Sequence, residues 1–376
     1  MNILVNANCS TGGAIPWCAV MTSLLGKHPR HHFVVCVSPQ VRQALGENFV
    51  SPPNVEVLDY PRRIKATLVF LRSPALDRLV EKYEIDMVFT VFGPTYWHPR
   101  VPHVCGFAKS QYIYENSPIF RMMSPPARLI MAFKHLVHMA SFRRDVDAYI
   151  TEDEPISAAL RQLIPGKPVY TVSNSCNPVF DRREEWRAHP LPPFDGVTLL
   201  TVSADYPHKN LGIIPRTAEY LRRKHPDFLF RFVVTLGPET FGYTAANVPD
   251  WLLPVGSVGI DECPLLYEQC DFMFLPTLLE CFSASYAEAM KMRRPILTSD
   301  LSFARGLCRD AAEYFDPLSP EDIGETIYRL ANDPERRQLL IDNGVVRGRS
   351  FLNAEERTAS YMRILEKEYA RLAKIS

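Results

Sequence analysis

Glu280 and Glu288 lie on either side of a predicted helix start, and their spacing could serve one polar ligand. A strand is predicted before Glu280, and the helix begins near Ser283 or Ser285, either of which could cap it. The N–H groups and positive dipole end of such a helix favour an anion. A carboxylate beside a bound phosphate can accept hydrogen bonds from vicinal sugar hydroxyls. The two carboxylates could therefore hold two sugars of one nucleotide-sugar molecule; the plain alternative is two solvated glutamates.

A lysine follows a second predicted strand. In the stretch TVSADYPHKNL the strand ends near Ser203, Pro207 holds a turn, and Lys209 comes next. A lysine at the mouth of a site can neutralise a diphosphate as it leaves, when its negative charge grows. Taken alone, the same residue would be interpreted as an exposed surface lysine.

The first predicted strand-to-helix turn contains a glycine pair. Gly12 and Gly13 allow the backbone to approach a ligand closely, and Pro16 suits the first turn of the following helix. The G-x-G-x-x-G pattern of dinucleotide-binding proteins is absent from this turn. By itself the pair indicates only a tight turn.

Short β-branched runs alternate with helical patterns over most of the chain, which predicts parallel sheets built from βαβ units. In the first half the predicted strands are Ile3–Ala7, Phe33–Ser38, Val55–Leu58, Met87–Val91, Val101–Phe107, Ala148–Ile150 and Val169–Val172, with helices at Ala14–Leu25 and Ala75–Lys82. In the second half they are Val197–Ser203, Phe230–Thr235, Trp251–Val255, Phe272–Leu275 and Arg294–Thr298.

A chain of 376 residues is too long for one ordinary core and fits two domains. The proline-rich segment 188–196 has no periodicity, so we place the junction there or slightly before it, near 174–181. The predicted organisation is an N-terminal Rossmann-like domain over 1–185 and a C-terminal nucleotide-sugar-binding domain over 190–355. A tail helix over 356–376 could pack back on the N-terminal domain.

The composition is that of a soluble globular protein, with 47% hydrophobic and 22% charged residues. Lys plus Arg equal Asp plus Glu at 42 each, so no overall field favours nucleic acid as a partner. The N-terminal run has no basic n-region and is broken by Asn6, so we interpret it as a strand rather than a signal peptide. Nine scattered cysteines without a CxxC pair fit a reducing compartment, and we expect a cytoplasmic protein.

The segment 120–144 carries Arg121, Arg128, Lys134, Arg143 and Arg144 but no acidic residue, and its apolar positions recur at helical spacing. A basic amphipathic helix of this kind can lie on the inner face of an anionic membrane, which would make the protein peripheral there. The alternative is a core-packed helix with a solvated basic side.

The motif that runs from Glu280 to Glu288, with Arg294-Pro295-Ile296 after it, resembles the Glu-x7-Glu signature of retaining family 4 glycosyltransferases, also called glycosyl transferases group 1. Residues 314–317, Tyr-Phe-Asp-Pro, resemble a later segment of that family. The resemblance covers about 197–344. It implies an α/β protein of the GT-B fold, with two facing Rossmann-like domains, parallel sheets and a cleft between them.

The resemblance also implies roles for individual residues. Glu288 would bind the nucleotide ribose, while Glu280 and Lys209 would be catalytic at the donor sugar and the diphosphate. Backbone amides at the helix start and in the glycine turn would meet the sugar and the phosphates. The implied donor-binding residues are Gly12, Gly13, His208, Lys209, Phe282, Ser283 and Glu288.

Two positions depart from the family pattern. Ala204 stands where the family has a phosphate-binding Arg, and His208 or another basic residue could replace it. Residues 108–109, Ala-Lys, stand where many members have a His-Asp pair. The remaining acceptor-side candidates are Lys109, Tyr112 and His103, although the position of His103 inside a strand favours a packed core histidine.

The implied function is transfer of a hexosyl group from a nucleotide-diphosphate donor to a glycan or lipid-linked acceptor, with retention of anomeric configuration, in bacterial polysaccharide assembly. We expect no cofactor and no metal, since Lys209 and a helix end would hold the diphosphate. Two alternatives stay open: a non-catalytic GT-B subunit that binds a sugar nucleotide or a partner, and an inverting GT-B enzyme with His98 or His103 as base.

Overall fold

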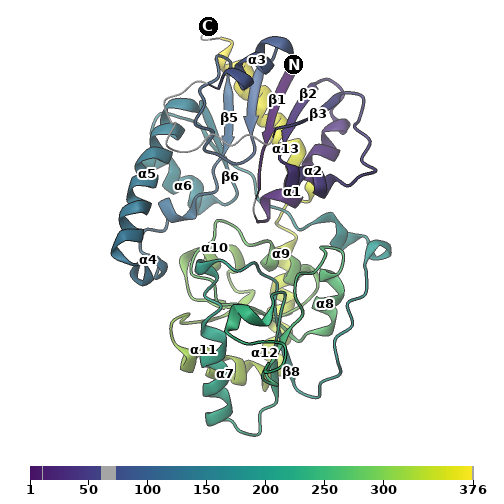
Figure 1. Cartoon of the computed structure of the whole chain (residues 1–376), viewed down its shortest axis with the longest axis vertical. Coiled ribbons are helices and arrows are strands. Elements are labelled where there is room, and N and C mark those ends of the chain that lie inside the picture. The colour runs from purple at the N-terminus through teal and green to yellow at the C-terminus, as the bar shows by residue number, and fades with distance from the viewer. Residues whose placement is uncertain (11, 61–72, 375–376) are drawn as a thin grey trace. The chain divides into compact units, whose positions relative to one another are not determined.

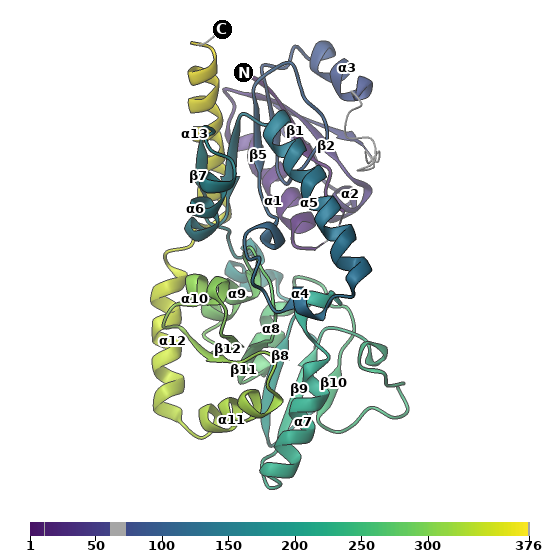
Figure 2. The same cartoon turned by 90° about the vertical axis from the view of Figure 1, so that its left-hand side faces the viewer.

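The computed structural model describes residues 1–10, 12–60 and 73–374, and the chain forms two compact units. Unit 1 contains Met1–Glu115, Met123–Asn174 and Leu352–Ser376, and unit 2 contains Asn116–Met122 and Ser175–Phe351. Figure 1 colours both units by position along the chain, and Figure 2 turns the same ribbon by 90°.

Unit 1 is built on a parallel sheet with the strand order β3-β2-β1-β4-β5-β6-β7. Its strands are β1 (Asn2–Ala7), β2 (His32–Val37), β3 (Val55–Asp59), β4 (Met87–Thr90), β5 (His103–Gly106), β6 (Ala148–Thr151) and β7 (Val169–Thr171). Ile3 and Val5 face one hydrophobic cluster and Leu4 faces another, so the sheet is buried on both sides. Continuous apolar runs are typical of such doubly covered parallel strands.

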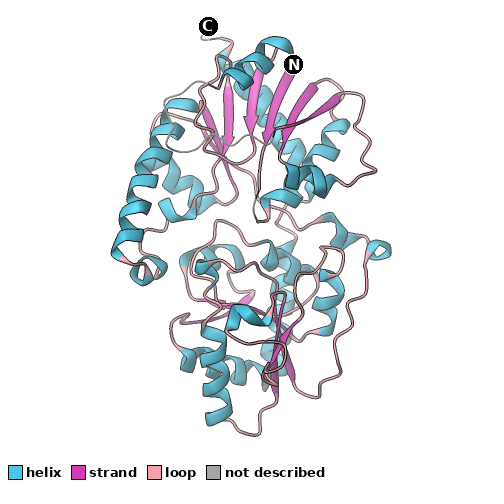
Figure 3. Cartoon of the chain, viewed as in Figure 1, coloured by secondary structure: helices cyan, strands magenta, loops and turns pink. Residues whose placement is uncertain are grey.

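Helices cover both faces of this sheet, as Figure 3 shows. They are α1 (Ala14–Leu24), α2 (Pro39–Leu45), α3 (Pro74–Lys82), α5 (Pro125–Asp145), α6 (Glu154–Leu163) and α13 (Ala354–Leu372). Of the helices in the described ranges, none combines the length and apolar character that crossing a bilayer requires.

Unit 2 repeats the architecture with a parallel sheet in the order β10-β9-β8-β11-β12-β13. Its strands are β8 (Val197–Thr201), β9 (Phe230–Val234), β10 (Leu252–Pro254), β11 (Phe272–Leu275), β12 (Ile296–Ser299) and β13 (Ala312–Phe315). Its helices are α4 (Ile119–Met122), α7 (Ile213–Lys224), α8 (Cys263–Gln269), α9 (Ala284–Lys291), α10 (Ser302–Cys308), α11 (Pro320–Ala331) and α12 (Pro334–Gly348). A large apolar cluster in its core joins α7 and α11 to the strands.

The predicted strands are all present, with ends that differ by at most two residues, while β13 was not predicted. The basic segment 120–144 is not one helix: α4 ends at Met122, and α5 starts anew at Pro125. Pro125 occupies the first position of α5, where its missing N–H costs no hydrogen bond.

The boundary between the two units falls between Asn174 and Ser175 in the sequence, before the proline-rich segment. Residues 116–122 lie in unit 2 rather than in the predicted first domain.

The last helix, α13, belongs to unit 1 through a buried polar side chain. The Arg357 guanidinium is fully buried, donates to Glu152 at 2.7 Å and lies 3.8 Å from the centre of the Trp17 ring. Tyr361, Met362 and Leu365 follow at helical spacing and join the apolar cluster around β1. A capping box between Asn353 and Glu356 starts the helix. These contacts attach the end of the chain to a sheet made from its beginning.

We expect Arg357→Ala to destabilise unit 1 by about 3–5 kcal/mol, because it leaves the Glu152 carboxylate buried without its partner. Arg363→Ala is the matched control, since Arg363 is exposed on the same helix, and it should cost less than about 0.5 kcal/mol. Urea unfolding followed by Trp fluorescence gives both values. Equal costs for the two variants would show that the buried ion pair does not hold α13.

Candidate functional site

The strand order of unit 2 locates a site before any side chain is considered. When its six strands are numbered by their order along the chain, they lie across the sheet in the order 3-2-1-4-5-6. The direction of the numbering therefore reverses between β8 and β11. In open parallel sheets, ligands bind beyond the carboxyl ends of the strands at this reversal. The loop after β8 carries Lys209 and the loop after β11 carries Glu280, so both predicted catalytic residues follow the two strands that define the reversal.

Lys209 and Glu280 form an ion pair there. The Lys209 Nζ lies 2.6 Å from Glu280 Oε1, and the two side chains are only 14% and 10% exposed. The Thr277 hydroxyl lies 2.9 Å from the same carboxylate oxygen and 3.1 Å from the His208 carbonyl, both of which are acceptors. Thr277 is fully buried, so its hydroxyl fixes the orientation of the Glu280 carboxylate within the loop.

The Lys209 backbone is held by the residue that follows it. Lys209 ends a short 3-10 turn (Pro207–Lys209), and Asn210 closes that turn in the left-handed conformation at φ 55. Asn is among the few residues that tolerate this conformation. The Asn210 side chain donates to the Pro317 carbonyl at 2.8 Å, which ties the Lys209 turn to the loop after β13.

The Glu280 loop is fastened to the Lys209 turn by the backbone. The Leu278 N–H donates to the His208 carbonyl at 2.7 Å. On its other side, the Leu278 carbonyl accepts a 2.7 Å hydrogen bond from the buried Ser117 hydroxyl. Ser117 comes from the short segment 116–122 that joins unit 2, so the Glu280 loop has supports from two distant parts of the sequence.

Helix α9 starts behind Glu280, with Ser283 at its N-cap position. The Ser283 side chain makes no capping hydrogen bond, while the Ser285 hydroxyl lies 3.5 Å from the Val202 carbonyl. The sequence analysis named both serines as possible caps, and neither side chain has that role. The Phe282 ring packs edge-on against Phe351 at 5.3 Å, so its side chain is structural and only its backbone could meet a ligand.

Glu288 lies in α9 and is buried, with its Oε2 atom 3.1 Å from the Tyr267 hydroxyl, which donates. Burial raises the pKa of the Glu288 carboxyl to about 7, although the Tyr267 hydrogen bond and the Lys209 charge both act in the opposite direction. The positive charge of Lys209 therefore acts on both predicted glutamates. Near neutral pH, the Glu288 carboxyl is therefore divided between its protonated and ionised forms.

His208 lies half-buried beside Lys209, with its ring stacked on Tyr206 at 5.5 Å. Burial lowers the pKa of His208, and the Glu280 carboxylate partly offsets that effect. Ala204, at the position of the missing arginine, is exposed. His208 is thus near the ion pair, but its lowered pKa leaves it a hydrogen-bonding group more than a fixed positive charge.

In unit 1 the glycine turn also follows a strand at an order reversal, since β1 and β4 are neighbours. Gly12 has φ 66, a conformation that favours glycine. Gly13 is the N-cap residue of α1, and a Cβ placed on it meets no described atom within 4 Å. A side chain at Gly13 would therefore have space among the described residues, and phosphate binding by this turn stays a prediction.

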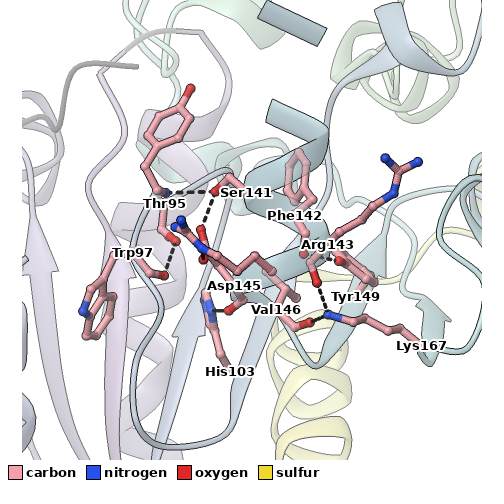
Figure 4. A network of polar contacts seen from close by, with 12 residues as sticks. Thr95, Trp97, His103, Ser141, Phe142, Arg143, Asp145, Val146, Tyr149 and Lys167 are labelled. Carbon is pink, nitrogen blue, oxygen red and sulfur yellow. Dashed lines mark hydrogen bonds and ion pairs between the residues drawn. The ribbon is translucent and has the colours of Figure 1, made fainter. Parts of the chain in front are cut away.

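His103 is a core residue of unit 1 and offers no surface to an acceptor. Its Nε2 lies 2.9 Å from the Thr90 hydroxyl and its Nδ1 lies 2.5 Å from the Asp145 carbonyl. Figure 4 shows this ring beside the network in which Ser141 donates to Asp145. Burial lowers the pKa of His103 to about 4, so the ring is neutral at physiological pH. The core interpretation of His103 is the one that its surroundings support.

The other two acceptor-side candidates differ from each other. Lys109 is half-buried in the loop after β5. Tyr112 is buried under α5, where its hydroxyl lies 2.8 Å from His138 Nδ1 and its ring stacks on His135 at 4.4 Å. The expectation of an acceptor-facing Tyr112 side chain does not agree with this burial, because helix α5 covers the ring.

Sequence reasoning missed the residues that position the site: Thr277, Asn210, Tyr267 and Ser117. Two of them could have been found in the sequence: Thr277 comes shortly after a buried strand, and Asn210 comes directly after the predicted site lysine. Tyr267 and Ser117 could not have been found, because a tyrosine in a short apolar helix and a serine in a distant loop look ordinary in one sequence.

Residues 182–347 match the sequence model of the family described as glycosyl transferases group 1. The matched range contains Lys209, Glu280 and Glu288. The matched range is less than half of the chain, and over this range the chain is similar to that family. No curated protein matches the chain.

Solved structures resemble the whole chain. They include a sucrose-phosphate synthase from Thermosynechococcus elongatus, with TM-score 0.71, 14% identity and 100% of each chain covered. A glycosyltransferase from Rickettsia africae has TM-score 0.70, 11% identity and 98% of each chain covered. Anabaena HepE in complex with UDP and glucose has TM-score 0.67, 13% identity, and 97% and 99% coverage of this chain and that one. These likenesses confirm the predicted α/β GT-B fold.

The raised pKa of Glu288 predicts a pH-dependent stability of unit 2. The pKa of Glu288 is about 7 in the folded state and 4.5 in its usual range, so ionisation favours the unfolded chain. The contribution of Glu288 to the free energy of unfolding is therefore complete below about pH 4.5 and is lost as the pH rises through 7. Glu288→Gln does not titrate there. We expect the unfolding free energy of the wild type, relative to Glu288→Gln, to fall by about 3 kcal/mol between pH 4.5 and 8. Urea unfolding at several pH values measures it, and a constant difference would contradict the buried carboxyl.

Proposed function

We propose that this chain transfers a hexosyl group from a nucleotide-diphosphate donor to a glycan or lipid-linked acceptor, with retention of anomeric configuration. The observation that carries the proposal is the Lys209–Glu280 ion pair at the strand-order reversal of unit 2, within the range that matches group 1 glycosyl transferases. HepE was solved with UDP and glucose and with UDP-glucose, so UDP-glucose is the first donor to test.

In the proposed site, Lys209 exchanges partners when the donor binds. Without a ligand its charge is neutralised by Glu280 at 2.6 Å, so the fold can contain these two largely buried charges. A diphosphate that arrives at the loops after β8 and β11 competes for the same ammonium group. As the sugar–phosphate bond breaks, negative charge collects on the leaving oxygen, and the Lys209 charge stabilises the transition state more than the bound donor.

Glu280 then becomes available to the donor sugar. The Thr277 hydroxyl still holds one carboxylate oxygen at 2.9 Å, so the group keeps its orientation when Lys209 moves to the phosphates. A fixed carboxylate can accept hydrogen bonds from sugar hydroxyls and favours the positive charge that develops at the anomeric carbon. Glu280 would therefore stabilise the transition state more than the bound donor.

Glu288 is proposed to hold the nucleotide ribose. A vicinal diol donates two hydrogen bonds to a charged carboxylate, and such bonds lower the carboxyl pKa. Because burial has raised the pKa of Glu288 to about 7, ribose binding would favour the ionised form and release a proton. Tyr267, which donates to Oε2, would keep the second oxygen directed toward the ligand.

Retention needs no separate protein base. The bond between the anomeric carbon and the phosphate oxygen breaks, and the acceptor oxygen bonds to the same face of that carbon. The acceptor proton passes to the departing phosphate oxygen on that face, so charge and atoms balance within the nucleoside diphosphate and the product. Lys209 provides the positive charge at the phosphates, and we propose that transfer proceeds without a divalent metal.

Glu288→Gln and Glu280→Gln should have different kinetic effects, because the two side chains contact different parts of the donor. Loss of a charge-assisted hydrogen bond should weaken binding of the nucleoside diphosphate about 10- to 100-fold in Glu288→Gln. Glu280→Gln should bind it within a few fold of wild type and lose on the order of 10²-fold in turnover. Calorimetric titration and steady-state assays measure the two effects. Wild-type affinity in Glu288→Gln would exclude the ribose assignment.

Lys209→Met should lower turnover on the order of 10²-fold or more, since the leaving diphosphate loses its positive partner. Lys224→Met is the control, because Lys224 is exposed at the end of α7. Both variants are assayed with UDP-glucose and other nucleotide sugars in excess EDTA, and NMR gives the anomeric configuration of the product.

Activity that disappears in EDTA and returns with magnesium or manganese would contradict the metal-free site. A product of inverted configuration would indicate an inverting enzyme. Donor binding without transfer to any glycan or lipid-linked acceptor would support the non-catalytic subunit.

A further inference from the structure

Helix α5 exposes apolar side chains where a helix of a soluble domain normally presents polar ones. Leu129, Phe133 and Leu136 are 74%, 62% and 72% exposed. At 3.6 residues per turn, these positions lie within about 60° of the helix circumference, and Ile130 lies beside them. We call Leu129, Ile130, Phe133 and Leu136 the apolar stripe of α5. Contiguous exposed apolar surface of this kind marks an interaction site.

The opposite face of α5 is polar in part and packs against unit 1. His138 lies 2.8 Å from the Tyr112 hydroxyl, and His135 stacks on the same ring. The buried Ser141 hydroxyl donates to the Asp145 carboxylate at 2.6 Å. Specific polar contacts therefore fix the rotation of α5 about its own axis. With this rotation the apolar stripe faces away from the core of unit 1. Figure 1 shows the helix along the outer edge of its unit.

The charged side chains of α5 are basic up to its last residue, Asp145. Arg128 and Lys134 are exposed on the two flanks of the stripe. Arg143 and Arg144 are exposed near the end of the helix, where Arg144 is paired with Asp145. Between 120 and 144 the sequence contains no Asp or Glu. A second copy of the same face would bring like charges together. An anionic surface that also accepts apolar side chains is the complementary partner.

We propose that the apolar stripe of α5 inserts into the headgroup region of a bilayer that contains anionic lipid, with the helix axis parallel to the membrane plane. Leu129, Phe133 and Leu136 would enter the acyl boundary while Lys134 and Arg128 remain at the phosphates. Each basic residue near such a surface adds attraction that salt screens over about 8–10 Å. This inference does not depend on the proposed transferase activity.

The test uses the full chain and vesicles of phosphatidylcholine, alone or with about one third phosphatidylglycerol. We expect co-sedimentation with the anionic vesicles that decreases with added salt, and little with the neutral ones. Phe133→Ser combined with Leu136→Ser should lower the partition coefficient at least about tenfold, because two large apolar side chains no longer enter the bilayer. Lys134→Glu should lower it several-fold through charge alone, roughly in line with the attraction per basic residue.

The matched control is Leu339→Ser combined with Val346→Ser, which removes two exposed apolar side chains from α12 of unit 2. We expect it to bind vesicles as the wild type does. Thermal midpoints of all variants should agree within about 2 °C, since the changed side chains are exposed. Equal loss of binding in the stripe and control variants would overturn the proposal, as would wild-type protein that stays in the supernatant with every vesicle.

A third result would also overturn it. If the wild type sediments as a dimer without lipid and the stripe variant sediments as a monomer, a second copy of the chain covers the stripe. Sedimentation velocity on the same samples distinguishes this outcome from membrane binding.

Discussion

The ion pair between Lys209 and Glu280 is the interaction on which the candidate site depends. Two opposite charges with 14% and 10% exposed side chains can remain in the fold only if they are close together and hydrogen-bonded. Parallel strands β8 and β11 make this possible, because they are neighbours in the sheet and end at the same edge. The position of every other site residue can be described relative to this pair.

The supports of the pair are mostly backbone groups. The His208 carbonyl accepts from the Leu278 N–H and lies near the Thr277 hydroxyl, so one peptide oxygen joins the two loops. Asn210 continues the connection to Pro317 after β13. A side chain that is fixed through backbone hydrogen bonds loses little further entropy when a ligand binds, which favours catalysis by positioning.

Two long helices of unit 1 use their apolar residues in opposite ways. In α13, Tyr361, Met362 and Leu365 enter the core, and Arg357 on the same face is matched by Glu152. In α5, the inward face contains His138 and Asp145, while Phe133 and its neighbours point to solvent. The buried polar groups named here have hydrogen-bond partners in both helices. The difference is that the apolar side of α13 packs in the core, whereas the apolar stripe of α5 is exposed.

Local pattern in the sequence was sufficient for the elements and for the main polar residues. Apolar runs of strand length determined the sheets. The spacing of Glu280 and Glu288 was compatible with two solvated glutamates, and it was the resemblance of their motif to a family signature that selected them as candidate site residues. Only the tertiary structure decided which residues meet: Lys209 and Glu280 are 71 positions apart, and Arg357 and Glu152 are 205 apart. It also decided that Tyr112 is buried under α5 and that the apolar stripe of α5 faces outward. The physical reason is that periodicity along a chain reports which residues share a face of one element, whereas strand order and helix rotation determine what that face touches.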